Sequence, residues 1–262
     1  MPNFERISSK DNQLVKTAVS LVGSAKARKE SNMFVLDGLR LCRDAVLNSF
    51  PVEAFIVSEN AYDKFRQDAD FIAEKSEKCY IVPSYIIEKI SDTVNPQGFI
   101  CICKMKENDG FVFDKNKLYI GLENLQDPSN LGAVSRSAEA FAFGGILVSS
   151  NGCDPYGPKA LRASMGALLR IPVIDIGYFP SFLANCDLTS FAAVVDADAK
   201  HINDVKFKAG SLILVGNEAN GLTSETISAA DFSVTIPMTG KAESLNAATA
   251  ASILIWEMSR GL

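Results

Sequence analysis

The chain has 262 residues, of which 47% are hydrophobic and 22% are charged, and its formal net charge is −5. At about 150 residues per domain, this length predicts one large domain or two modest ones. The composition is ordinary for a soluble globular protein and excludes a collagen, a coiled coil and a disordered tail. No apolar run approaches the roughly 18 residues that span a bilayer, and the polar first residues show no secretory signal. We therefore expect a cytoplasmic protein that does not contact a membrane.

The first hundred residues alternate between helical and strand patterns. Apolar residues recur at helical spacing over 10–22, and the later patterns predict strands at 33–36, 54–57, 79–82 and 99–103 with helices at 39–48, 61–76 and 85–91. This alternation predicts an α/β domain over residues 1–105. The polar stretch 106–116 is the expected linker.

Positive charge gathers near the start of the chain. Residues 10–29 contain five positive side chains and one negative, although the whole chain is acidic. Such a patch favours contact with a polyanion at one place. A solvated helix face explains so small a cluster equally well.

The rest of the chain predicts a second α/β domain at 117–262 with a largely parallel sheet, whose strands are expected at 118–122, 145–149, 173–176, 191–195, 212–215 and 233–236. Ligands of parallel sheets bind beyond the carboxyl ends of the strands. Three polar loops follow these strands, and each alone is also explained by turns and helix caps. Together they indicate a site. Arg136 follows the first loop, and we expect it to lie buried near the sheet, where it needs an anionic partner.

Several chemistries are excluded or disfavoured. The chain has one histidine, His201, which excludes His-rich zinc sites, and its polar surroundings predict a surface loop. The six cysteines contain no C-x-x-C pair, and Cys101 and Cys103 lie in an apolar run where we expect a core strand. No G-x-G-x-x-G and no Walker lysine motif follows a strand. We therefore expect no metal and no dinucleotide.

The three loops together resemble the motifs of the SpoU/TrmH family of RNA 2′-O-ribose methyltransferases, which belongs to the SPOUT superfamily. The matching segments are Asp127-Pro128-x-Asn130-x-Gly132-Ala133-x-x-Arg136-x-Ala138, Leu214-Val215-Gly216-Asn217-Glu218-x-x-Gly221-Leu222, and Ile236-Pro237-Met238 followed by Glu243-Ser244-Leu245-Asn246-x-Ala248. Residues 161–168 are similar to a further stretch of that family, and residues 34–40 more loosely resemble its N-terminal RNA-binding domain. Ala142 and Asp37 depart from the family pattern, where glycine and glutamate are common.

This resemblance implies a C-terminal SPOUT domain with a deep trefoil knot, and a small N-terminal RNA-binding domain resembling a ribosomal-protein fold. It implies S-adenosyl-L-methionine as cofactor, a homodimer formed through the C-terminal domain, and methyl transfer to a ribose 2′-hydroxyl. Ribosomal RNA is favoured over transfer RNA by analogy with the N-terminal fold. The alternatives are a tRNA 2′-O-methyltransferase and a non-catalytic RNA- or ribosome-binding protein on the same scaffold.

The resemblance also implies roles for individual residues. Arg136 would orient the 2′-oxygen and stabilise its developing charge, because an arginine stays protonated and is a poor base. Asn130 would support the same pocket, and Glu218 would orient a neighbouring arginine or a substrate group. Ser244 and Asn246 would shape the third loop and contact the cofactor or the ribose. The cofactor-binding residues would be Leu214, Val215, Gly216, Asn217, Ile236, Pro237, Met238, Ser244 and Leu245. The expected RNA-binding residues are Lys26, Arg28, Lys29 and Arg40.

Overall fold

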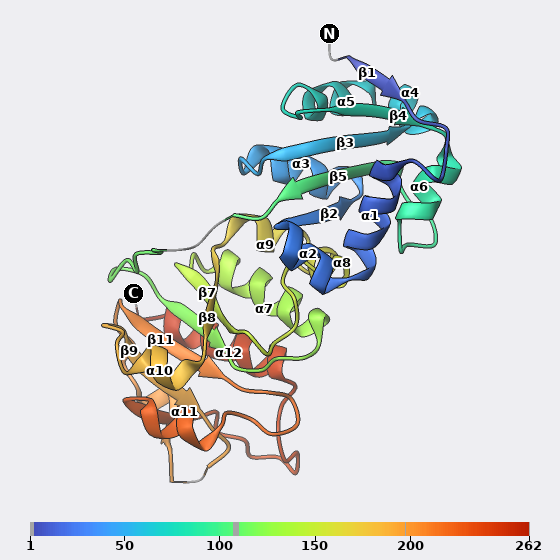
Figure 1. The fold of residues 1–262 in the computed structure, drawn as a ribbon. Helices are drawn as coiled ribbons and strands as arrows, with labels where there is room; N and C mark the ends of the chain where they lie inside the picture. The colour runs from blue at the N-terminus through green and yellow to red at the C-terminus, as the bar shows by residue number, and fades with distance from the viewer. Residues whose placement is uncertain (1–2, 107–109, 197, 262) are drawn as a thin grey trace. The chain divides into compact units, whose positions relative to one another are not determined.

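The computed structural model describes residues 3–106, 110–196 and 198–261 (Figure 1). Residues 107–109 of the expected linker therefore lie outside the described residues. The chain forms two compact units, Met1–Glu107 with Tyr156–Leu169, and Asn108–Pro155 with Arg170–Leu262. The first unit thus contains a segment, 156–169, that comes long after the expected linker.

The first unit is built on a sheet whose described strands have the order β1-β4-β3-β5-β2. Strands β1, β4 and β3 run parallel, whereas β5 is antiparallel to both of its neighbours. The strand bounds are β1 Phe4–Arg6, β2 Met33–Asp37, β3 Val52–Ser58, β4 Cys79–Val82 and β5 Phe99–Lys104. The expected strands are confirmed, and β1 is an addition that the sequence patterns did not predict.

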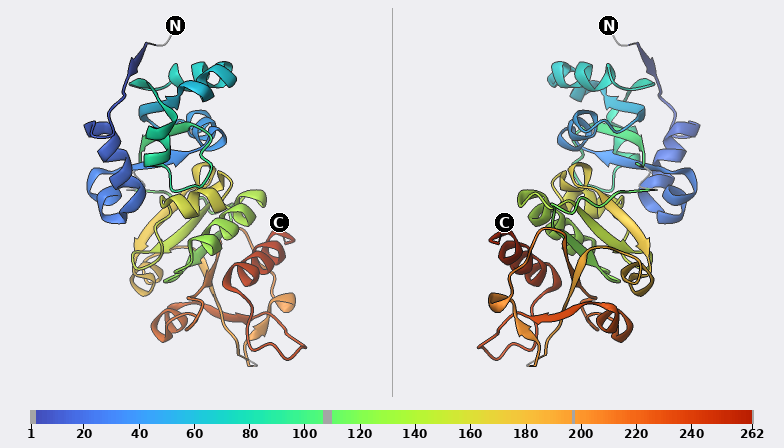
Figure 2. Two further views of the ribbon diagram at one scale, coloured as in Figure 1. Left: turned by 90° about the vertical axis from the view of Figure 1, so that its right-hand side faces the viewer. Right: turned by 90° about the vertical axis from the view of Figure 1, so that its left-hand side faces the viewer.

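Helices cover both faces of this sheet (Figure 2). Helices α1 (Gln13–Gly23) and α6 (Ser84–Ile90) pack on one face, and α3 (Leu39–Leu47), α4 (Glu59–Lys64) and α5 (Arg66–Ala73) pack on the other. The single helix expected at 61–76 is therefore wrong. The backbone of Phe65, at φ −126° and ψ 44°, separates α4 from α5. Cys101 and Cys103 are fully buried in β5, as expected of a core strand.

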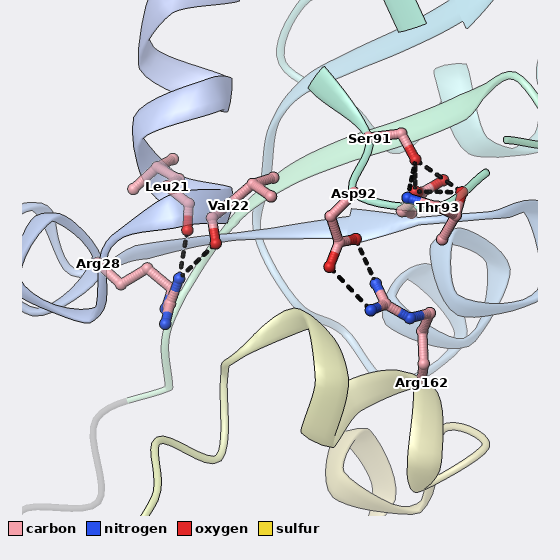
Figure 3. Close-up of polar contacts among 8 residues, drawn as sticks. Leu21, Val22, Arg28, Ser91, Asp92, Thr93 and Arg162 are labelled. Carbon is pink, nitrogen blue, oxygen red and sulfur yellow. Dashed lines mark hydrogen bonds and ion pairs between the residues drawn. The ribbon is translucent and has the colours of Figure 1, made fainter. Parts of the chain in front are cut away.

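The segment 156–169 joins the first unit through an ion pair and a ring contact. It contains α8 (Pro158–Ala163) and most of α9 (Ala167–Arg170), and α8 packs near β2. Arg162 donates to both carboxylate oxygens of Asp92, at 2.5 and 2.8 Å (Figure 3). The rings of Tyr156 and Phe34 lie 4.6 Å apart between centroids. The connection between β7 (Gly145–Ser149) and β8 (Val173–Gly177) of the second unit therefore includes a segment of the first unit.

The second unit is built on a sheet in which every described strand pair is parallel, in the order β10-β12-β9-β11-β6-β7-β8. The bounds are β6 Tyr119–Leu122, β7 Gly145–Ser149, β8 Val173–Gly177, β9 Thr189–Ala193, β10 Lys200–His201, β11 Ser211–Val215 and β12 Phe232–Thr235. All residues of β7 and β11 are buried, which explains their apolar runs. The expected parallel sheet is confirmed. His201 is exposed, but it lies in the edge strand β10 and not in a loop.

Helices also form a layer on each face of the second sheet (Figures 1 and 2). Helices α7 (Pro128–Ala140) and α12 (Ala247–Ser259) pack against each other on one face. Helices α10 (Phe179–Leu183) and α11 (Ser224–Ala229) pack on the other, and the 3-10 helix η1 (Ile202–Asp204) follows β10. Phe179 and Leu183 of α10 share a core cluster with Leu214 of β11. The expected α/β class is therefore confirmed in both units.

Candidate active site

The carboxyl ends of β9, β11 and β12 border a cavity of about 650 Å³ in the second unit. Its walls come from the segments that follow β9, β11 and β12, and from the beginning of α12. This volume lies within the range of about 300–1,000 Å³ that is usual for small-molecule sites. The predicted residues that line it are Val215, Gly216, Asn217, Glu218, Ile236, Met238, Ser244 and Leu245.

Two predicted cofactor residues are not among the residues that line this cavity. Leu214 is fully buried in the core cluster on the α10 face of the sheet. Side chains alternate between the faces of a strand, so Leu214 and Val215 point to opposite sides. Pro237 is exposed, while its neighbours Ile236 and Met238 line the cavity. The motif thus contains a core residue and a surface residue beside the residues that form the site.

The loop 216–222 is closed by hydrogen bonds across its base. Asn217 and Gly221 exchange backbone bonds of 3.0 and 2.9 Å. The side-chain oxygen of Asn217 accepts from the backbone N–H of Ala219, and its amide group donates to the carbonyl of Asn124. A Cβ on Gly216 would lie 2.0 Å from the carbonyl carbon of Gly221. The tight loop therefore requires glycine at position 216.

The side chains of Glu218, Asn130 and Asn246 are joined in one hydrogen-bond network. Asn130 Nδ2 donates to Glu218 Oε1 at 2.8 Å, and Asn246 Nδ2 donates to Asn130 Oδ1 at 3.1 Å. The Glu218 carboxylate also accepts from the backbone N–H groups of Gln126 and Asp127, each at 3.2 Å. The structure thus brings together three of the five predicted catalytic residues, one from each motif.

The network lies where two helices begin. Asp127 caps α7 by accepting from the N–H of Ser129, and Pro128 follows it at the first helical position. Asn246 caps α12 by accepting from the N–H groups of Ala248 and Thr249. The same residues therefore fix the beginnings of both helices and connect them to the loop after β11.

Burial raises the pKa of the Glu218 carboxyl, but the hydrogen bonds from Asn130 and from backbone N–H groups outweigh this effect, so the pKa lies below its ordinary value of 4.5. The Glu218 carboxylate is consequently ionised at neutral pH. Burial raises the pKa of the nearby Cys153 thiol to about 12. A thiol that stays protonated is a poor nucleophile, and the site therefore offers no activated cysteine at this position.

Arg136 and Ser244 are placed differently from the network. The structure corrects the expectation of a buried Arg136, because this residue is exposed on α7. It follows Ala133 by three residues, and Ala133 lines a shallow groove between α7 and α12. Ser244 is exposed at the rim of the cavity. Both side chains are open to a bound substrate.

The expected RNA-binding residues of the first unit divide into two groups. Lys26, Lys29 and Arg40 are exposed. Arg28 is only 6% exposed, and its guanidinium donates to the carbonyl oxygens of Leu21 and Val22 (Figure 3). This corrects the expectation for Arg28, whose side chain is turned toward the last turn of α1 and away from solvent.

Glu123 is the residue near the site that sequence reasoning missed. It follows the last residue of β6. Its side chain is buried, and its carboxylate accepts hydrogen bonds from Thr223 and Thr226. A carboxylate directly after an apolar strand is a weak signal, but buried carboxylates need partners and therefore fix what they bind.

No group of His, Cys, Asp and Glu side chains within the described part of the chain has the arrangement of a metal site. None of the described helices combines the length and the hydropathy required to cross a membrane.

Known proteins resemble this chain over nearly its whole length. It is 27% identical to the 23S rRNA (guanosine(2553)-2′-O)-methyltransferase of Bacillus subtilis, over 97% of this chain and 99% of that protein. It is 26% identical to the 23S rRNA (uridine(2479)-2′-O)-methyltransferase of Streptomyces viridochromogenes, over 99% and 93%. The structure of an AdoMet-bound rRNA methyltransferase from Sinorhizobium meliloti matches with a TM-score of 0.88 at 26% identity, covering 99% and 98% of the two chains.

Two family models match, one for each part of the chain. Residues 12–101 match the MRM3-like substrate binding domain. Residues 117–256, more than half of the chain, match the SpoU rRNA methylase family. The chain therefore belongs to the SpoU rRNA methylase family of RNA methyltransferases.

Proposed function

We propose that this chain transfers the methyl group of S-adenosyl-L-methionine to a ribose 2′-hydroxyl of ribosomal RNA. The observation that carries the proposal is the cavity of the second unit. The loop 216–222 lines this cavity, and Glu218 of the same loop is bonded to Asn130, which is bonded to Asn246. The two 23S rRNA methyltransferases that match at least 97% of this chain support ribosomal RNA as the substrate.

The residues around the cavity fit the cofactor. Ile236, Met238 and Leu245 supply apolar surface for an adenine ring, and the loop 216–222 supplies backbone polar groups beside them. Ser244 at the rim offers a hydroxyl to a polar part of the cofactor or to ribose. When bound, the cofactor supplies a methyl group on a positively charged sulfur that a hydroxyl oxygen can attack.

Arg136 is the residue that we assign to the 2′-hydroxyl. Its guanidinium stays protonated in proteins and is planar, so it can hold the 2′-oxygen and an adjacent phosphate and can stabilise the charge that develops on attack. In this assignment Glu218 and Asn130 act as positioning residues, because their polar atoms bind each other and the beginnings of α7 and α12.

Labelled methyl transfer tests this proposal. We expect label from S-adenosyl-L-methionine to enter ribose of unmodified ribosomal RNA, and we expect Arg136→Ala to lower the rate by at least about 100-fold while cofactor affinity changes little. Arg260→Ala, which removes an exposed arginine from the end of the same unit, is the matched control. Transfer of label to tRNA alone would show that the substrate is tRNA and not ribosomal RNA. Cofactor binding without transfer to any RNA, or no cofactor binding, would favour a non-catalytic RNA-binding protein.

We further propose a homodimer formed by the second unit, the trefoil knot typical of the family, and a cytoplasmic location. The groove between α7 and α12 supports the dimer, because Ala133, Ala248, Ile253 and Trp256 give it apolar surface beside the polar side chains of Asn130, Asn246, Thr249 and Ser252. Trp256 is 53% exposed. Arg136 follows Ala133 on α7, so a partner seated on this groove would lie near it.

A further inference from the structure

Glu123 holds both ends of the loop 216–222. Its backbone N–H donates to the carbonyl of Val215 at 2.9 Å, and Val215 is the last residue before the loop. Its carboxylate accepts from Thr223 N at 2.8 Å, from Thr223 Oγ1 at 3.0 Å and from Thr226 Oγ1 at 2.6 Å. Thr223 is the first residue after the loop and caps α11. One residue at the end of β6 therefore fixes where the loop begins and where it ends.

These bonds lie in a buried environment. Glu123 is 3% exposed and Thr226 is fully buried. If the carboxylate loses its donors, it stays buried without hydrogen bonds, and its desolvation is not compensated. The same holds for the donors if the carboxylate is removed. The loop thus has a strongly preferred conformation before any ligand arrives, and its residues Gly216 to Leu222 form one wall of the cavity.

We propose that Glu123 is a positioning residue for cofactor binding, which holds the loop 216–222 in the conformation that accepts S-adenosyl-L-methionine. The proposal rests on the proposed function. A preformed loop lowers the ordering cost of binding. Glu123 itself is absent from the cavity wall, so its loss should weaken cofactor affinity and leave turnover at saturating cofactor nearly unchanged.

Three variants and one control test this inference. Glu123→Ala removes all three side-chain bonds, Thr226→Val removes one hydroxyl and keeps the side-chain shape, and Glu123→Gln keeps an oxygen for Thr223 N. Glu225→Ala removes an exposed carboxylate from the first turn of α11 and is the control. The measurements are amide hydrogen exchange of residues 216–222 without cofactor, the dissociation constant of S-adenosyl-L-methionine by calorimetry, and turnover at saturating cofactor.

For Glu123→Ala we expect faster exchange in the loop and a dissociation constant raised about tenfold, because part of the binding free energy is then used to order the loop. Thr226→Val should give a smaller rise, Glu123→Gln should restore part of the affinity, and Glu225→Ala should behave as the wild type. If Glu123→Ala fails to fold, Thr226→Val and Glu123→Gln decide the question.

Unchanged exchange and unchanged affinity in folded Glu123 variants would overturn the inference, as would a loss of turnover at saturating cofactor with intact affinity. A wild-type protein that does not bind S-adenosyl-L-methionine would instead contradict the proposed function. In that case, faster exchange of the loop in the variants would show that Glu123 stabilises the loop without a role in cofactor binding.

Discussion

Glu218 links the loop after β11 to the segment at the beginning of α7 through a carboxylate that remains partly open to water. Its hydrogen bonds to Asn130, Gln126 and Asp127 stabilise the ionised form and hold its pKa below 4.5 in the folded chain, although burial acts in the opposite direction. A carboxyl group whose pKa is lowered by folding adds stability that is fully present above its unfolded pKa. That stability is lost as the pH falls through the lower, folded value.

We therefore expect Glu218→Gln to destabilise the protein by about 1 kcal/mol at neutral pH, since solvent screening weakens the bonds of an exposed carboxylate. The difference from the wild type should shrink below about pH 4.5, where the unfolded carboxyl binds a proton. Urea unfolding at pH 7 and at about pH 3.5 measures both values. Glu225→Gln, in the same unit, is the control. An equal difference at the two pH values would contradict a role for the charge.

The placement of some site residues is predictable from the sequence, and that of others is not. Asn130, Glu218 and Asn246 come together because each follows or begins an element at the carboxyl edge of one parallel sheet, which the strand pattern makes predictable. The burial of Arg28 and the exposure of Arg136 were not predictable in this way. Both depend on which face a helix turns toward its neighbours, and motif spacing does not fix that rotation.

At the scale of elements, apolar runs predicted the strands well because β7 and β11 are buried on both faces. The short helices were harder to predict. The break at Phe65 and the helix α2 (Ala25–Ser31) depend on local backbone geometry and caps, such as Ser24 accepting from the N–H of Ala27. The return of 156–169 to the first unit depends on tertiary contacts, among them the pair of Arg162 with Asp92.

Helix α2 presents Lys26 and Lys29 to solvent, while Arg28 satisfies carbonyl groups at the end of α1. If this helix docks RNA, replacing both lysines by alanine should weaken binding and lower the slope of log K against log salt by up to about 2, roughly one unit for each lost phosphate contact. Filter binding to ribosomal RNA at several salt concentrations gives this slope.

The matched control is the Lys75→Ala and Lys78→Ala pair, which removes two exposed lysines from elsewhere in the same unit. Arg28→Ala should act differently, because it leaves buried carbonyl groups without their donor and lowers the stability of the first unit. An unchanged salt slope for the Lys26 and Lys29 pair would rule out α2 as the docking helix.

At the scale of the whole molecule, the exposed aromatic surface of the second unit is the main argument for assembly. Trp256 and Phe141 are 53% and 38% exposed, and their ring centroids lie 5.3 Å apart. Beside them lies the groove between α7 and α12, which is lined by apolar and polar side chains in equal number. An exposed aromatic pair next to such a groove favours a protein interface. Covering this surface in a dimer would remove it from water and bring a partner near Arg136.

If the proposed dimer forms through this surface, we expect Trp256→Glu to convert it to a monomer, because the carboxylate would be buried without a partner in the interface. Sedimentation velocity over a range of protein concentrations measures this change. Tyr178→Glu is the control, since Tyr178 is an equally exposed aromatic residue (52%) before α10, on the other face of the sheet. If Arg136 acts across the interface, the Trp256→Glu monomer should lose methyl transfer and still bind the cofactor. A wild type that sediments as a monomer would contradict the proposed dimer. A Trp256→Glu variant that remains dimeric would show that the interface lies elsewhere.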